Sequence, residues 1–192
     1  MVKLDFTNAF NSLHRYDMLS AVHSRIPKIY THCHSAYSQS SILFHGPYTV
    51  SSQERPQQGD PVGPLLFCNS IQPMLSSLES ELNLGHLDDV SLGGLVDTVA
   101  ADVTRIAKEG SEMGLHLNAS KCELTAHQRS TVTDELLRSF LRVDVCDASL
   151  LSAPLFHGLA ADYHSQPIAV EMLGPINKSA SDFLTLLAHK IS

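Results

Sequence analysis

The chain has 192 residues, enough for one domain with a proper core, and its 43% hydrophobic and 17% charged residues are typical of a globular protein. No apolar run approaches the ~18 residues of a membrane span and no signal-peptide pattern opens the sequence, so we expect an intracellular protein that is neither secreted nor in a membrane. The net charge of −7, from 13 Lys and Arg against 20 Asp and Glu, disfavours a freestanding nucleic-acid binder, whose affinity comes mainly from neutralising phosphates.

Hydrophobic spacing and turn residues predict strands and helices in alternation along the first half of the chain. The predicted elements are a strand at 2–6, a helix over 8–25, a second helix from Pro27 to about Ser38, and a hairpin of strands 41–44 and 48–51. A polar loop with two prolines and a glycine follows over 53–61.

The second half begins with the longest predicted helix and becomes less regular toward its end. The predicted elements are a helix over 62–82, a hairpin around Asp88-Asp89, a helix over 96–113 that ends at Gly114, short strands at 115–117 and 122–125, a helix over 130–141, and a partly helical segment over 169–191. This order indicates an α+β fold in which helices cover one face of a sheet and leave the other face free for a ligand.

Two adjacent aspartates, Asp88 and Asp89, lie between short apolar runs with glycine on both sides, a pattern typical of a tight hairpin with carboxylates at its tip. Adjacent like charges need water or a cation to compensate them. Two divalent metals ~4 Å apart can bind several carboxylates and a transferring phosphoryl group. Asp5, near the end of the first predicted strand, supplies a third carboxylate. The alternatives are a solvated Asp-Asp turn and a surface aspartate on an edge strand.

Four segments of the chain resemble the palm motifs of reverse transcriptases, in that family's order and with the spacing of the non-LTR retroelement branch. They are Leu4-Asp5-Phe6-Thr7-Asn8-Ala9-Phe10-Asn11; Gln57-Gln58-Gly59-Asp60-Pro61 with Pro64-Leu65-Leu66-Phe67; His86 to Asp89; and Gly114-Leu115-His116-Leu117-Asn118 with Lys121-Cys122-Glu123. The resemblance covers residues 1–126 well and the remainder weakly.

The resemblance implies a ferredoxin-like polymerase palm over residues 1–127, with an antiparallel sheet and helices on one face. Residues 128–192 would form a helical extension, a connection with an incomplete primer-grip and thumb-like segment. Because only four residues precede Asp5, we expect the family's fingers region to be missing upstream, as in a fragment of a longer polyprotein.

The resemblance also implies an RNA-directed DNA polymerase that uses an RNA template, a DNA primer and deoxynucleoside triphosphates. Asp5, Asp88 and Asp89 would hold two Mg²⁺ ions, with Mn²⁺ as a substitute, and Lys121 would protonate the departing pyrophosphate. The nucleotide site would comprise Phe6, Asn8, Ala9, Phe10, Gln58 and Gly59. The structural alternatives are a core role for Phe10, a turn glycine at Gly59 and a solvated surface lysine at Lys121.

Three positions depart from the family pattern. His86 stands where tyrosine or phenylalanine is usual, and Arg55 and Ser152 stand where glycine is usual; a lost glycine matters where φ must be positive. A catalytically inactive retroelement relic, or a binding domain derived from a reverse transcriptase, is therefore a second hypothesis, and enzymatic activity stays open. An unrelated acidic metal-binding domain is the third, although it leaves the motif order unexplained.

Overall fold

The computed structural model describes residues 1–52, 55–57, 59–126, 132–151 and 153–154. The chain divides into two compact units, each built from separate stretches of sequence. The sheet unit comprises Met1–Asp5, Leu78–Thr104 and Asn118–Ser192, and the helical unit comprises Phe6–Ser77 and Arg105–Leu117. The boundary near the start of the chain therefore falls between Asp5 and Phe6.

A five-stranded sheet in the order β4-β5-β1-β6-β7 forms the centre of the sheet unit. The strands are β1 (Val2–Leu4), β4 (Leu82–His86), β5 (Asp89–Gly93), β6 (Glu123–Leu124) and β7 (Leu141–Arg142). β1 lies in the middle, antiparallel to both β5 and β6, whereas β7 pairs with β6 in parallel. The expected α+β fold is confirmed, and the sheet is antiparallel except at its edge, where β6 and β7 pair in parallel.

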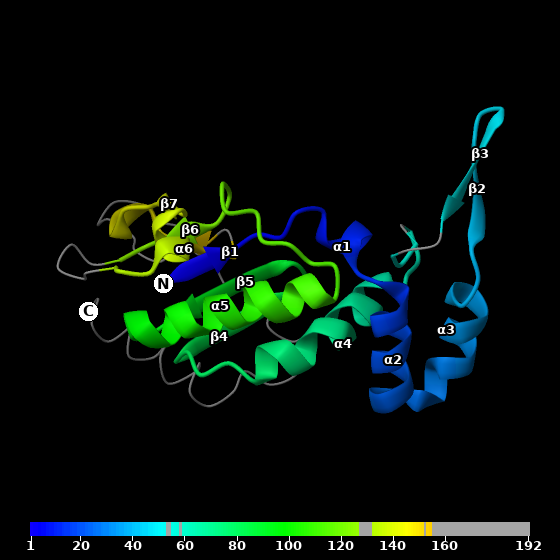
Figure 1. The fold of residues 1–192 in the computed structure, drawn as a ribbon, viewed down its shortest axis with the longest axis horizontal. Coiled ribbons are helices and arrows are strands. Elements are labelled where there is room, and N and C mark those ends of the chain that lie inside the picture. The colour runs from blue at the N-terminus through cyan, green and yellow to red at the C-terminus, as the bar shows by residue number, and fades with distance from the viewer. Residues whose placement is uncertain (53–54, 58, 127–131, 152, 155–192) are drawn as a thin grey trace, which may run out of the picture. The chain divides into compact units, whose positions relative to one another are not determined.

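Alternation along the strands gives the sheet one apolar face and one polar face. The buried apolar face consists of Val2, Leu4, Val90, Leu92 and Leu124. The first half of helix α5 (Val96–Glu112), drawn in green in Figure 1, belongs to the same unit as β4 and β5, and its Val99 and Val103 side chains are buried. The carboxylate of Asp102, which is 2% exposed, accepts hydrogen bonds from the backbone N–H groups of Glu79 and Ser80, and so ties α5 to the segment that leads into β4.

The helical unit packs its helices against one another and carries a separate two-stranded hairpin. Its elements are α1 (Ala9–Ser12), α2 (Arg15–Arg25), η1 (Pro27–Ile29), α3 (Tyr30–Tyr37), β2 (Ser41–His45), β3 (Tyr48–Ser52) and α4 (Gly63–Ser76). α2 packs against both α3 and α4. The largest fully buried side chains here are those of Leu13, Met18, Val22, Leu66, Phe67, Ile71, Ile106 and Leu115.

The expected single helix over 8–25 is wrong, because two helices occupy this span. The backbone is extended at Leu13 and at His14, between α1 and α2. There the backbone N–H of His14 donates a hydrogen bond to the carbonyl of Met113, 3.0 Å away. This bond is made to a residue about a hundred positions away in the sequence, so a periodicity argument over 8–25 could not include it.

Several other boundaries differ from the expected ones. α4 ends at Ser76 and Leu82 belongs to β4, so the helix over 62–82 is shorter than expected. The strand over 115–117 is reduced to one bridge between Leu117 and Phe6. Of the helix over 130–141, the described part forms only α6 (Glu135–Arg138).

Beyond β7 the described elements are short. They are η2 (Val145–Asp147), β8 (Ser149–Leu150) and β9 (Ala153–Pro154), while the partly helical segment expected over 169–191 lies outside the described residues. Within the described part of the chain, no helix is both long and apolar enough to cross a membrane.

Candidate active site

The register of the sheet places Asp5 and Asp89 beside each other at one end of β1 and β5. Leu4 pairs with Val90 in the antiparallel ladder, so the next position along β1, Asp5, stands opposite Asp89. Directly opposite residues of antiparallel strands project on the same side of the sheet. Lys3, two positions before Asp5, shares this side, whereas Leu4 belongs to the buried face. Asp5 and Asp89 therefore lie at one end of the polar face of the sheet.

Asp88 lies in the turn that joins β4 to β5. His86 pairs with Asp89, so Leu87 and Asp88 are the two central residues of the hairpin. Leu87 has φ 55°, a left-handed conformation that costs an L-residue roughly 1–2 kcal/mol. Bulky residues rarely adopt this conformation, and strained backbone of this kind is found more often at functional sites than elsewhere.

Burial and neighbouring carboxylates both act on the carboxyl group of Asp89. Its pKa is raised above the ordinary value by partial burial, and the charges of Asp88 and Asp5 act in the same direction, against the attraction of Lys3. The structure thus brings Asp5, Asp88 and Asp89 close enough together for their charges to interact.

The side chain of Lys3 is a cation that acts on Asp89, and the sequence did not mark it as a candidate site residue. Its Nζ lies 3.1 Å from a carboxylate oxygen of Glu123 on β6 and donates a hydrogen bond to the Ser149 hydroxyl. Lys3 therefore links three strands of the sheet unit on the face that carries Asp5. Its position in an apolar strand beside an aspartate gave no distinct signal in the sequence.

The segment of the fourth motif is bonded directly to the backbone of Asp5. The N–H of Asn118 donates to the Asp5 carbonyl at 2.8 Å, and the carbonyl of Asn118 in turn accepts from the N–H groups of Lys121 and Cys122. The N–H of Asp5 points at the Cys122 sulfur, 3.4 Å away. Burial raises the pKa of the Cys122 thiol, which keeps it a neutral partner in this contact.

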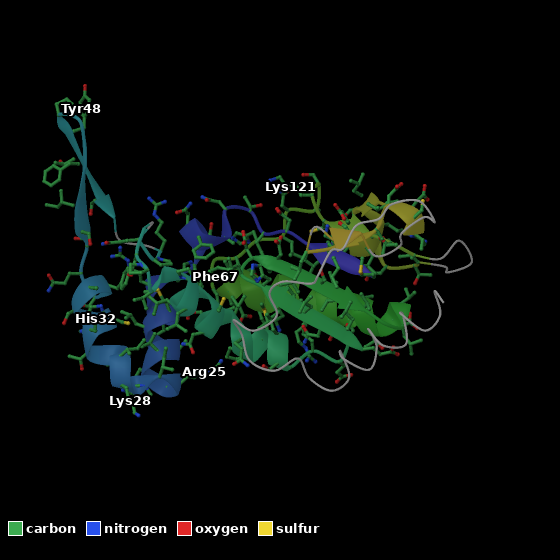
Figure 2. The ribbon with its side chains drawn as sticks, turned by 180° about the vertical axis from the view of Figure 1, so that it is seen from behind. Arg25, Lys28, His32, Tyr48, Phe67 and Lys121 are labelled. Carbon is green, nitrogen blue, oxygen red and sulfur yellow. The ribbon has the colours of Figure 1, made fainter. Side chains whose placement is uncertain are left out.

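This turn fixes the position of Lys121 relative to Asp5 through the backbone. The Lys121 side chain itself is exposed (Figure 2). Cys122 is a free thiol and is fully buried. Its contact with Asp5 spans 117 positions in the sequence, and no local pattern indicates it.

Carboxylate oxygens are the ligands that Mg²⁺ prefers, so the donor chemistry of Asp5, Asp88 and Asp89 suits a hard divalent cation. The mutual repulsion at Asp89 is of the kind that a bound cation relieves. Among the described residues, however, no group of three His, Cys, Asp or Glu side chains is arranged to hold a metal ion. The three aspartates therefore suit a hard divalent cation by their donor chemistry alone.

The residues expected to contact a nucleotide belong to the helical unit. Phe6 is buried, and Asn8 precedes α1 with φ 51°. α1 is a single helical turn, in which Ala9 is buried and Phe10 stacks on the buried ring of Phe67 with centroids 4.5 Å apart. The half-buried Phe10 ring thus packs against Phe67 within the unit.

The loop of the second motif is held by a tyrosine of α3. Asp60 accepts hydrogen bonds from the Tyr37 hydroxyl and from the N–H of Val62 through its carboxylate, and the Gln57 N–H donates to the Tyr37 oxygen at 3.2 Å. Burial, with the Asp60 bond, raises the pKa of Tyr37 to about 12. Between these anchors Gly59 has φ 88°, the region that favours glycine. Gln58 lies outside the described residues.

A buried arginine completes the support of this loop. Arg15, at the start of α2 and 6% exposed, donates hydrogen bonds to the carbonyls of Gln39 and Arg55, each at 3.0 Å. Its guanidinium also lies over the Tyr37 ring, 5.4 Å from the centroid. Sequence reasoning missed both Arg15 and Tyr37, since their contacts join residues 20 or more positions apart.

One protein family matches this sequence over most of its length. The model of the family described as reverse transcriptase (RNA-dependent DNA polymerase) matches residues 1–172. The chain belongs to the reverse transcriptase family. No curated protein matches it.

Membership identifies the general chemistry of the reverse transcriptase chain. The family is that of RNA-dependent DNA polymerases, which in general use divalent metal ions and act on a nucleic-acid template and primer with deoxynucleoside triphosphates. The matched residues include the whole of the helical unit, most of the sheet unit and all four motif segments.

Proposed function

We propose that this reverse transcriptase chain is an RNA-directed DNA polymerase palm of the non-LTR retrotransposon type, which transfers dNTPs onto a primer 3′-hydroxyl. The observation that carries the proposal is the pairing of Leu4 with Val90, which sets Asp5 opposite Asp89 beside the Asp88 turn. The match of the family over residues 1–172 supports the same chemistry. The motif spacing supports the non-LTR type.

Asp5, Asp88 and Asp89 would hold two Mg²⁺ ions, or Mn²⁺ in their place. When bound, such ions lower the pKa of the attacking hydroxyl and neutralise charge on the triphosphate and the leaving pyrophosphate. Lys121, held near Asp5 by the Asn118 turn, would donate a proton to that pyrophosphate.

We assign nucleotide contacts to Phe6, Asn8, Ala9, Phe10, Gln58 and Gly59. Support comes from the motif match and, at Gly59, from a backbone that only glycine adopts easily and that has no neighbour within 4 Å of a would-be Cβ. We further assign residues 1–127 to the palm and 128–192 to a connection with a partial primer-grip and thumb-like segment.

A second candidate is a catalytically inactive derivative of a reverse transcriptase, and Arg55 favours it. This residue, at a usual glycine position, has φ 69°. The backbone at Arg55 thus has the left-handed conformation that glycine favours, although the residue there is an arginine. His86, which also departs from the family pattern, lies beside the aspartate turn and pairs with Asp89. Ser152, the third such position, lies outside the described residues.

The test separates metal binding from catalysis. Mn²⁺ binding is followed by electron paramagnetic resonance in the wild type, in Asp88→Asn, and in Glu81→Gln as a control carboxylate of the same unit. Primer extension on an RNA template with Mg²⁺ or Mn²⁺ is then measured for the same three proteins.

The polymerase proposal expects Mn²⁺ binding and extension that are both lost in Asp88→Asn and kept in Glu81→Gln. Metal binding without extension by the folded protein would favour the inactive derivative. If Asp88→Asn binds Mn²⁺ as well as the wild type does, the three-aspartate site is wrong.

A further inference from the structure

The hydroxyl group of Tyr37 joins two points of the loop of the second motif. It donates a hydrogen bond to the carboxylate of Asp60, and its oxygen accepts one of 3.2 Å from the backbone N–H of Gln57. The two positions between these points are Gln58 and Gly59, to which the proposed function assigns nucleotide contacts. One side chain of α3 therefore holds both ends of the short segment that would contact the nucleotide.

Hydrogen bonds within the loop and to β2 hold the same two points. The Asp60 N–H donates to the Gln57 carbonyl at 3.1 Å, and the Asp60 carboxylate accepts from the Val62 N–H at 2.8 Å. The Gln57 side chain donates to the Ser41 hydroxyl at 2.9 Å. Gly59, in contrast, is exposed, and no atom of the described residues lies within 4 Å of the position that a Cβ would take there. The flanks of Gly59 are thus fixed while its own backbone stays accessible.

Tyr37 is itself fixed by burial and by a cation. Its side chain is 3% exposed, and the guanidinium of Arg15 lies 5.4 Å from the centroid of its ring. The same guanidinium donates to the carbonyls of Gln39 and Arg55, so it holds the ring and the start of the loop together. Burial, with the Asp60 bond, raises the pKa of Tyr37 to about 12, and the hydroxyl therefore stays protonated and able to donate near neutral pH.

We propose that Tyr37 is a positioning residue of the nucleotide site, whose hydroxyl holds the loop in the conformation in which Gly59 receives the incoming deoxynucleoside triphosphate. The inference rests on the proposed function, to which the contacts of Gln58 and Gly59 belong. Tyr37 acts through the loop, because its ring is buried and its hydroxyl is bonded to two loop groups. Contacts that are preorganised bind more tightly than contacts that must be ordered on binding. Loss of the hydroxyl should therefore weaken the binding of the nucleotide.

A purely structural role of Tyr37 predicts a different kinetic result. If the hydroxyl only stabilised the fold, its loss would lower the fraction of active molecules, so the apparent kcat would fall while the KM for the nucleotide stayed the same. A positioning role raises that KM and leaves kcat close to the wild-type value, because the lost interaction is made in the ground state and in the transition state alike. The two constants together therefore separate the two roles.

Tyr37→Phe tests the proposal, because it keeps the ring and removes only the hydroxyl. Tyr16→Phe, on a ring of α2 that is 80% exposed, is the matched control. The affinity of a fluorescent dGTP analogue is measured with Mg²⁺ and a dideoxy-terminated primer on an RNA template, and hydrogen exchange of a peptide over 55–63 reports the order of the loop. We expect Tyr37→Phe to bind the analogue about tenfold more weakly and to exchange faster, and Tyr16→Phe to match the wild type.

A second variant tests whether the hydroxyl acts through the carboxylate of Asp60. In an Asp60→Ala background, Tyr37→Phe should have little further effect on the affinity for the nucleotide, because the two groups belong to one interaction. Independent, additive effects of the two changes would contradict the proposed route.

Wild-type nucleotide affinity in Tyr37→Phe overturns the proposal, even where exchange in the loop becomes faster. A fall in kcat with an unchanged KM also overturns it, as does the absence of nucleotide binding by the folded wild type. Nucleotide binding that Tyr37→Phe weakens, in a protein that extends no primer, would sink only the polymerase proposal. Extension by Tyr37→Phe with the wild-type KM would sink only this one.

Discussion

The carbonyl oxygen of Arg55 accepts a hydrogen bond of 3.0 Å from Nε of the buried Arg15, and Arg55 has φ 69° where it presents that oxygen. Arg55, at the start of the loop of the second motif, thus has a strained backbone, and the buried guanidinium of Arg15 holds its carbonyl in place. Burial lowers the pKa of Arg15, and the charge of Arg55 acts in the same direction. The two arginines are therefore bonded through one backbone oxygen while their charges repel.

Replacing Arg55 by glycine should stabilise the protein. Glycine relieves a left-handed strain of roughly 1–2 kcal/mol and loses part of that gain to its greater freedom in the unfolded chain. We expect the free energy of unfolding in urea to rise by about 0.5–1 kcal/mol. Arg55→Ala, which removes the charge and keeps the strained φ, is the matched control. Equal stabilisation by alanine would show that charge repulsion, and not φ, is the cause.

Removing the hydroxyl of Tyr37 should loosen the same loop. Tyr37→Phe leaves the Asp60 carboxylate and the Gln57 N–H without a shared partner, which costs about 1.5 kcal/mol of unfolding free energy at pH 7. The exposed Tyr16, changed to phenylalanine, serves as the control in urea denaturation. A loss as small as that of the Tyr16 control would mean that water replaces the hydroxyl.

Tyr37 also predicts a loss of stability in alkali. Its pKa is about 12 in the folded protein against about 10 for an unperturbed tyrosine, so the folded state holds the proton more tightly. The stabilisation is complete below pH 10 and is lost as the pH rises toward 12. Urea midpoints between pH 8 and 11 should fall more steeply for the wild type than for Tyr37→Phe. Parallel pH curves for the two proteins would contradict the assignment.

Gly114 should not tolerate alanine. A Cβ there would lie 2.2 Å from the carbonyl oxygen of Ser12 and 2.8 Å from Nε2 of His14, and φ is 87°. Strain and overpacking together should cost on the order of 3 kcal/mol in thermal or urea unfolding. Gly46→Ala isolates the strain alone, because φ is 58° there and nothing lies within 4 Å. Similar losses at both positions would show that the close approach to Ser12 relaxes easily.

Asp89→Asn should have opposite effects with and without a divalent metal. Without metal, loss of a charge repelled by Asp88 and Asp5 should raise stability by about 0.5 kcal/mol, a small value because the group is exposed. With millimolar Mg²⁺, the wild type should gain in melting temperature and the variant should gain less. Glu81→Gln is the matched carboxylate control. An equal response of both proteins to Mg²⁺ would remove Asp89 from the metal site.

Local chemistry predicted those parts of the fold that depend on neighbouring residues. The predicted hairpin at Asp88-Asp89 is present, and Gly114, just after α5, has a positive φ. Both features could be predicted because the preferences of turns and helix ends act within a few residues. Pro64 lies in the first turn of α4, as its fixed φ favours.

The parts that sequence reasoning missed depend on distant contacts. The break at His14 follows from a bond to Met113, and the Arg15–Tyr37 support of the second motif loop joins three separate segments. The parallel edge strand β7 is two residues long, too short for a periodic signal. The roles of the candidate site residues stay predictions, because backbone position alone does not establish chemistry.

β1 precedes every other strand of the sheet in sequence and is its central strand, which has a consequence for synthesis. Val2 pairs with Leu92 on one side and Leu124 on the other, so neither edge of β1 can be paired until the ribosome has made the residues that follow it as far as β5 and β6. At ordinary elongation rates an apolar strand waits on the order of ten seconds for its partners. During that interval the nascent chain is a natural client for ribosome-associated chaperones, and we expect its yield to depend on how fast the ribosome travels between β1 and β6.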